Sequence, residues 1–499
     1  MFFCYLSVQS LRSLKRMDLN DSVNLKELPQ LSTATNLEKL NLRNCSSLIK
    51  LPSLNGNSLE ELDIGGCSSL VEFPSFIGNA VNLRELDLSS FQNLLELPSY
   101  VGNATNLEKL DLSNCLNLVE LPLSLGNLQK LQRLILKGCS KLEVLPTNII
   151  LESLKKLDLA GCSSLDLAGC SIIGNAVNLR ELDISSLPQL LELPSIIGKA
   201  TNLEKLDVRF CSNLVELPLS LGNLQKLQRL ILKGCSKLDV LPANINLESL
   251  NVLNLCDCSM LTRFPQISTN IIFLDLIGTA IEQVPPSIMS WPRLEELKMS
   301  YFENLQEFPH ALERITELCL TDTEIQELPP WVKKMSSLNR FVLMGCRKLV
   351  SVPPISDSIS SINASDCESL EILECSFHNS KVRLNFASCF KLNQEARGLI
   401  IKTNSRYAVL PGGKVPEYFT HRATGGGPLT IKLNEKPLSK SMSYNNSMHM
   451  LHPALAEHLY IFRVKAEVTS SELLSDFKLK SDDVWKIGEC GLVQDLEIP

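Results

Sequence analysis

The sequence predicts an α/β leucine-rich-repeat solenoid, with a parallel β-sheet on its concave face and loops and 3₁₀ turns outside, followed by a small β-sandwich domain. The pattern L-x-x-L-x-L-x-x-C recurs every 21 to 25 residues through most of the 499-residue chain. A fixed period of this length is typical of stacked repeats, each too small to bury its own apolar side chains. Hydrophobic residues make up 44% of the chain but aromatic residues only 5%, so one aliphatic element is expected to build the core.

The first element of each repeat is expected to be a short β-strand. In segments such as Leu110-Asp111-Leu112, alternation turns the two apolar side chains inward and the middle one outward. Neighbouring repeats then bury their leucines against one another along a parallel sheet. The first position of the pattern falls at Leu14, Leu37, Leu59, Leu83, Leu107, Leu131, Leu154, Leu179, Leu203, Leu227, Leu250, Ile271, Leu294, Ile315, Leu338 and Ile359.

A column of cysteines follows these strands. Thiols spaced by about 24 residues give one per repeat rather than a chelating cluster, although composition alone leaves a catalytic or metal role open. We interpret them as small buried side chains at the strand-to-loop turn. The odd total of 17 cysteines favours a reducing compartment over a disulfide framework. The column comprises Cys45, Cys67, Cys115, Cys139, Cys162, Cys211, Cys235, Cys258, Cys346, Cys367 and Cys389.

The second half of each repeat carries a Leu-Pro step, as in Leu121-Pro122 and Leu217-Pro218. Proline lacks an N–H donor and blocks a regular helix, so this outer side is expected to form loops and short 3₁₀ turns.

An internal duplication is also present. Residues 121–142 and 217–238 are identical, and a looser match relates 77–154 to 173–250. One repeat departs from the pattern, because Leu157–Ser163 recurs as Leu165–Ser171 with no Leu-Pro step between them. A local irregularity is expected there, not a site.

The repeats divide the chain into three parts. Residues 1–10 form an N-terminal remnant, residues 11–380 form a solenoid of about 16 repeats, and residues 381–499 form a separate domain. In that domain Asn393–Ile401 suits a short helix, while Leu429–Leu433 alternates as a strand after a turn at Gly425–Gly427. A β-sandwich fits this pattern.

Composition and motifs exclude several function classes. A net charge of −7 argues against nucleic acid or an anionic membrane as a partner, and no apolar run reaches the length of a membrane span. Phosphate-loop, nucleophile-elbow, zinc-protease and kinase motifs are all missing. We therefore expect no catalytic, cofactor-binding or metal-binding residues. The loose cluster of His449, His452 and His458 is better explained as a solvated loop than as a metal site.

Several segments resemble plant intracellular immune receptors of the TIR–NB-ARC–LRR class. Asn24–Pro29 and Leu31–Leu40 are similar to the first repeats of those proteins. Further on, the chain resembles the family's post-LRR domain, called C-JID. The matching segments are Leu384–Cys389, Phe390–Ala396, Leu410–His421, Leu429–Leu433 and Trp485–Gly491. The stretch between Leu433 and Leu459 holds fewer strands than the family usually has, which leaves an incomplete sandwich as an alternative.

The resemblance implies the sensor portion of a plant disease-resistance receptor, located in the cytoplasm or the nucleus. It would recognise a pathogen effector or a guarded host protein. The family's TIR and NB-ARC domains, which use NAD and ADP or ATP, are not expected in this chain, so neither enzymatic activity nor a cofactor is expected. If the chain is a fragment, those domains are further partners. The alternative is a truncated, non-signalling scaffold or decoy. A bacterial leucine-rich-repeat ubiquitin ligase is disfavoured, because its repeats are shorter and its catalytic region is helical.

Two columns of outward residues suggest where a partner would bind. In the N-terminal two-thirds the outward face is acidic, and a solvated face balanced by Lys109, Lys156 and Lys205 is the simpler explanation. Its acidic residues are Asp63, Asp87, Asp111, Asp158, Asp183, Asp207 and Asp275. Further along, outward positions are apolar, as in a protein-binding hot spot, although they could instead pack on the post-LRR domain. The candidate partner-binding residues are Phe210, Ile231, Val252, Phe273, Ile277, Tyr301 and Met344.

Overall fold

The structure is a computed structural model of the whole chain. It describes residues 11–281, 291–300, 314–328, 330–375, 377, 381–403 and 405–412, and the strands 421–424, 428–432, 458–462, 472–476 and 489–492. The chain forms two compact units, Met1–Leu294 and Glu295–Pro499.

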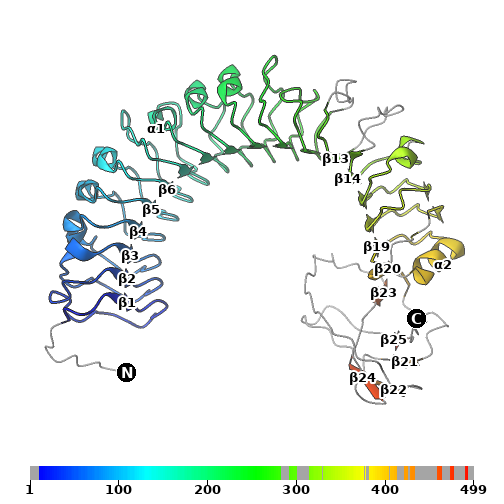
Figure 1. Cartoon of the computed structure of the whole chain (residues 1–499), viewed down its shortest axis with the longest axis horizontal. Helices are drawn as coiled ribbons and strands as arrows, with labels where there is room; N and C mark the ends of the chain where they lie inside the picture. Colours follow the sequence, from blue (N-terminus) through cyan, green and yellow to red (C-terminus); the bar gives the residue numbers. More distant parts are fainter. Residues whose placement is uncertain are drawn as a thin grey trace. The chain divides into compact units, whose positions relative to one another are not determined.

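In the first unit, every repeat contributes one short strand to a parallel ladder (Figure 1). Each strand pairs with the strand of the next repeat in unbroken register from β1 to β12. The strands are β1 (Arg16–Asp18), β2 (Lys39–Asn41), β3 (Glu61–Asp63), β4 (Glu85–Asp87), β5 (Lys109–Asp111), β6 (Arg133–Ile135), β7 (Lys156–Asp158), β8 (Glu181–Asp183), β9 (Lys205–Asp207), β10 (Arg229–Ile231), β11 (Val252–Asn254) and β12 (Phe273–Leu276).

The leucine pattern explains this ladder. In β5, Leu110 is fully buried, while Lys109 and Asp111 on either side of it are half-buried on the opposite face of the strand. Leu107 and Leu112 are also buried, so each repeat encloses its core between its strand and its outer turn. The predicted solenoid of leucine-rich repeats is confirmed.

The outer side of the first unit carries short helical turns, most of which begin directly after the proline of the Leu-Pro step (Figure 1). These are mainly the predicted 3₁₀ turns. They are η1 (Gly56–Ser58), η2 (Ser75–Asn79), η3 (Ser99–Asn103), η4 (Leu123–Asn127), η5 (Ser195–Lys199) and η6 (Leu219–Asn223).

The repeat without a Leu-Pro step is irregular, as expected. Its outer turn is a short α-helix, α1 (Ser171–Asn175), rather than a 3₁₀ turn. Leu165, Leu167 and Cys170 of the duplicated segment are buried. Since β7 and β8 still pair in register, the outer loop accommodates the irregularity without disturbing the sheet.

The second unit continues the same repeat. Parallel pairs join β13, β14, β15, β17, β19 and β20 in turn, and a second parallel pair joins β16 and β18. Its elements are β13 (Glu296–Ser300), β14 (Glu317–Thr321), η9 (Pro330–Lys334), β15 (Arg340–Val342), β16 (Ser351–Val352), β17 (Ser361–Asn363), β18 (Ile372–Leu373), β19 (Arg383–Asn385), α2 (Gln394–Lys402) and β20 (Tyr407–Pro411).

The described strands after β20 form antiparallel pairs. β23 pairs with β20, β25 with β21, and β24 with β22. Their bounds are β21 (His421–Thr424), β22 (Pro428–Lys432), β23 (His458–Phe462), β24 (Glu472–Asp476) and β25 (Glu489–Leu492). The helix predicted at 393–401 is α2, and the strand predicted at 429–433 is β22. The turn predicted at Gly425–Gly427 lies outside the described residues. The parallel ladder continues through β19 and β20, beyond residue 380. The domain boundary at residue 381 and the β-sandwich therefore stay predictions.

Candidate protein-binding surface

Three of the predicted partner-binding residues lie on the outward face of neighbouring strands β10 to β12. Val252 and Phe273 are direct partners in the register of β11 and β12, so their side chains are adjacent. Ile231 on β10 is opposite Asn254 on one side and Asp207 on the other. All three are half-buried, which leaves apolar surface open to a partner.

Phe210 and Ile277 lie beyond the strands rather than in them. Ile277 directly follows β12 and is half-buried. Phe210 is in the turn after β9, where its backbone is left-handed with φ of 60°, and 51% of the residue is exposed. A Cβ added to Gly234 of the next repeat would meet Cδ1 of Phe210 at 2.6 Å, so the ring lies against that glycine.

The remaining two predicted residues belong to other parts of the chain. Met344 lies in the second unit, after β15, and is exposed. Tyr301 lies outside the described residues. The apolar surface is therefore defined in the first unit by Phe210, Ile231, Val252, Phe273 and Ile277, which we call the β9–β12 surface.

The acidic column has a structural role that the sequence analysis missed. In β5, Oδ1 of Asp111 accepts a hydrogen bond of 3.0 Å from the backbone N–H of Ser113, two residues later. Such a turn closes the strand and satisfies a donor that leaves the ladder. Equivalent bonds are accepted by Asn41, Asp63, Asp87, Asp158, Asp183, Asp207, Asn254, Asp275, Asn363 and Asn385.

The acidic face is consequently less solvated than predicted. Asp207 and Asp275 are buried, because their carboxylates turn back toward their own strand ends. Partial burial raises the pKa of Asp63, and the neighbouring Asp87 carboxylate adds to that effect. A sequence signal could have revealed this hydrogen-bonding role. It is an Asp or Asn at the strand end, followed three residues later by a residue that tolerates left-handed backbone.

Cations cover the buried Asp207 carboxylate. Arg209 donates from Nε to Oδ1 of Asp207 at 2.9 Å and also pairs with Oδ2, while Nζ of Lys205 lies 4.0 Å from Oδ2. The hydrogen bond to Asp207 raises the pKa of the Arg209 guanidinium. Arg209 and Lys205 therefore supply part-exposed positive charge beside Phe210, with the half-buried carboxylate of Asp183 close to Arg209.

The cysteine column is buried, as predicted. Each thiol donates to a backbone carbonyl of the preceding repeat, for example Cys139 Sγ to Leu112 at 3.1 Å. Burial raises the pKa of Cys139 to about 12, so the thiol stays protonated and unreactive near neutral pH. Within the part of the chain that the structure describes, no group of acidic, cysteine and histidine side chains is arranged to hold a metal ion.

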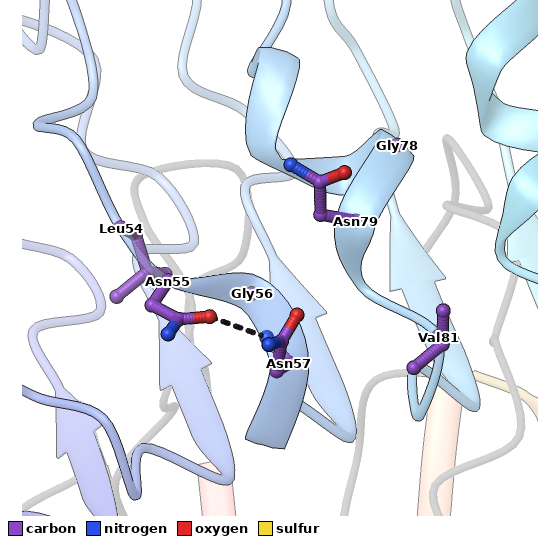
Figure 2. Close-up of a pocket in the computed structure, with 7 residues that line it drawn as sticks. All are labelled: Leu54, Asn55, Gly56, Asn57, Gly78, Asn79 and Val81. Atoms are coloured by element: carbon purple, nitrogen blue, oxygen red, sulfur yellow. Dashed lines mark hydrogen bonds between the residues drawn. The ribbon is translucent and has the colours of Figure 1, made fainter.

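Two open hollows lie outside the β9–β12 surface. The larger, of about 530 Å³, is between η1 and η2 and offers amides and apolar groups but no acid or base (Figure 2). In it, Oδ1 of Asn55 accepts from the N–H of Asn57 at 3.1 Å, a cap of η1. The second, of about 280 Å³, is lined by Gln132, Ser153, Lys155, Asn178 and Arg180. In the second hollow, Nζ of Lys155 donates to Oε1 of Gln132 at 2.9 Å.

Comparisons with known proteins identify the kind of chain. A family model described as "Leucine-rich repeat region" matches residues 143–270, and "Leucine Rich Repeat" matches 106–128. "Probable disease resistance protein RPP1" of Arabidopsis thaliana is 44% identical over 291 residues, covering 50% of this chain. "Disease resistance protein RPP5" of the same plant is 34% identical over 442 residues, covering 87%. Over its repeats, this chain is similar to plant disease-resistance proteins.

The chain spans 24% of the length of each of these two curated relatives. Among solved structures, a leucine-rich-repeat protein of Leptospira interrogans is 25% identical with a TM-score of 0.46, covering 67% of this chain and 91% of that one. In the described part of this leucine-rich-repeat chain, no helix has the length and apolar character needed to cross a membrane.

Proposed function

We propose that this chain is the sensor portion of a plant disease-resistance receptor, and that it recognises a pathogen effector or a guarded host protein by direct protein–protein contact. The observation that carries the proposal is the β9–β12 surface on a disease-resistance-like solenoid. Adjacent half-buried apolar side chains beside exposed cations resemble the centre and rim of a protein interface.

We further propose that the chain acts without enzymatic activity or a cofactor of its own, in the cytoplasm or the nucleus. In the longer family members, partner binding would control signalling by the TIR domain through the NB-ARC domain. The repeat ladder supports this division of labour, since it presents a broad surface rather than a reactive cleft.

A chimaera tests the proposal. The chain replaces the corresponding repeat region of the RPP5 relative, and the chimaera is co-expressed in leaves with a library of secreted pathogen proteins. We expect at least one library member to trigger cell death, and we expect V252D/F273D on the β9–β12 surface to abolish that response. V119D, at an exposed position in the loop that follows β5, is the control. Equal responses from both variants would contradict the assigned surface.

The alternative function is a non-signalling scaffold or decoy. In that case the chain expressed alone should suppress cell death triggered by an intact relative that shares its ligand, because it competes for that ligand. Suppression that is lost in V252D/F273D would favour the decoy, whereas no suppression favours the receptor.

A further inference from the structure

The internal duplication provides a comparison within the chain. Residues 104–142 and 200–238 are identical except at four positions: Leu112 and Val208, Ser113 and Arg209, Asn114 and Phe210, and Leu116 and Ser212. Two of these differences fall side by side in the turn after the strand. The second copy therefore differs from the first mainly by gaining Arg209 and Phe210.

The backbone of the two turns is the same. Asn114 has φ of 59° and Phe210 has φ of 60°. Both donate their N–H at 2.7 Å to the carbonyl of the next repeat, Lys137 or Lys233. Both side chains lie against a glycine, Gly138 or Gly234. The turn thus has the same backbone conformation with asparagine as with phenylalanine.

Phenylalanine is unusual at this position of the repeat. Left-handed backbone is unfavourable for a bulky side chain, whereas glycine and asparagine tolerate it. The other described left-handed residues at this position are Asp21, Asn44, Gly66, Ser90, Asn114, Gly138, Gly161, Ser186, Gly234, Asp257, Gly278, Asp322, Gly345, Asp366 and Ser388. Phe210 is strained and half exposed, and it is not needed to form the turn, since Asn114 forms the same one.

The charge beside Phe210 has also changed. In the first copy, Ser113 Oγ donates to Asp111 at 2.5 Å and adds no charge. In the second copy, Arg209 pairs with Asp207, whose carboxylate is fully buried, and 42% of the Arg209 side chain remains exposed. Lys205 and Lys233 are part-exposed nearby, while Asp257, 3.9 Å from Lys233, supplies an exposed negative charge.

We propose that Phe210 and Arg209 form a specificity site for an acidic protein segment that carries an apolar or aromatic side chain. The apolar side chain packs on Phe210 and Ile231, and flanking carboxylates pair with Arg209, Lys205 and Lys233. Charge complementarity selects the acidic partner, because Asp207 is hidden and the part-exposed cations Arg209, Lys205 and Lys233 outnumber Asp257 and the half-buried Asp183 near Arg209. This deepens the proposed function by naming the chemistry of the partner, and rests on that function for the existence of one.

Binding of a defined probe tests this. The full chain is titrated with a random copolymer of glutamate and tyrosine, with polyglutamate and with a copolymer of lysine and tyrosine, followed by biolayer interferometry. The chain carries a net charge of −7, so an acidic polymer can bind only at a local basic site. We expect the glutamate–tyrosine copolymer to bind at least tenfold more tightly than polyglutamate, with weakening by salt.

Exchange of residues between the copies provides the controls. R209S/F210N restores the first-copy residues and should reduce copolymer binding at least tenfold. F210N alone should raise Tm, because asparagine relieves the strain. S113R/N114F installs the pair in the first copy and should add a second binding site while lowering Tm.

The proposal would be overturned by no binding of the glutamate–tyrosine copolymer, by binding of R209S/F210N within twofold of the unaltered chain, or by a lower Tm for F210N. Loss of the lysine–tyrosine copolymer in R209S/F210N would also overturn it, since the site would then be acidic. These outcomes are independent of cell death. If the chimaera triggers no cell death, but copolymer binding is lost in R209S/F210N and gained in S113R/N114F, only the proposed immune function is contradicted.

Discussion

At the scale of single residues, the Asx turns after the strands are the most repeated polar feature of the first unit. Asp111 accepts the N–H of Ser113, and Asn residues take the same role in other repeats. D111A should reduce the free energy of unfolding by about 1 kcal/mol, since a typical hydrogen bond contributes about that much. D111N keeps the acceptor and should cost much less. Urea denaturation of both variants checks this, and equal losses would exclude the hydrogen bond as the cause.

The raised pKa of Asp63 predicts a pH dependence. Since the folded protein holds this proton more tightly than the unfolded chain, the carboxylate destabilises the fold at neutral pH. That cost disappears as pH falls through the raised pKa. D63N should therefore raise Tm at pH 7, and its advantage should shrink toward pH 4. D158N should behave likewise, because burial raises the pKa of Asp158. A Tm gain that stays constant from pH 7 to pH 4 would contradict raised pKa values for Asp63 and Asp158.

The buried thiols are expected to be unreactive toward thiol reagents in the folded protein. Burial raises the pKa of Cys115 and Cys139 to about 12, and neither is accessible to solvent. With a disulfide reagent at pH 8, both should stay unlabelled in the native protein as judged by peptide mass spectrometry. All 17 cysteines should react in 6 M guanidinium. Rapid native labelling of Cys139 would argue against the burial.

At the scale of the element, the strands from β2 to β11 each have one central leucine that is buried. Leu134 in β6 and Leu230 in β10 are fully buried and come from identical stretches of sequence. L134A and L230A should each cost ~2–5 kcal/mol, since each leaves a cavity between neighbouring repeats. The two variants control for each other in thermal or urea unfolding. A loss below about 1 kcal/mol in either would mean that its repeat relaxes around the cavity.

The strands and outer turns could be predicted because the leucine alternation and the Leu-Pro step each permit few structures. The outward positions of Ile231 and Val252 were predictable too, since they follow directly from the strand alternation, whereas their role in binding a partner stays a prediction. The position of Phe210 in a left-handed turn was not, because periodicity says which residue leaves the strand but not its backbone conformation. The role of Asp111 was missed for a similar reason: an outward carboxylate looks solvated unless the donor two residues later is considered.

At the scale of the whole molecule, the duplication makes the solenoid modular. β5 pairs with β6 through the same residue types by which β9 pairs with β10, so the interfaces are interchangeable. Deleting residues 122–217 joins Leu121 to Pro218 and should give a shorter chain that folds with β5 beside β10. Circular dichroism and size-exclusion chromatography check this. Deleting 122–229 instead joins Leu121 to Leu230, breaks the period and should aggregate. Equal behaviour of the two deletions would contradict the modularity.

The three-residue length of the strands has a mechanical consequence. Each strand from β1 to β12 is joined to its neighbours by a few backbone hydrogen bonds, and neighbouring strands come from successive repeats along the chain. Under tension, such a sheet should unfold one repeat at a time instead of all at once. Each released repeat of about 24 residues lengthens the chain by roughly 80 Å at full extension. The protein would behave as a soft, stepwise extensible tether, yielding long before its core is lost as a whole.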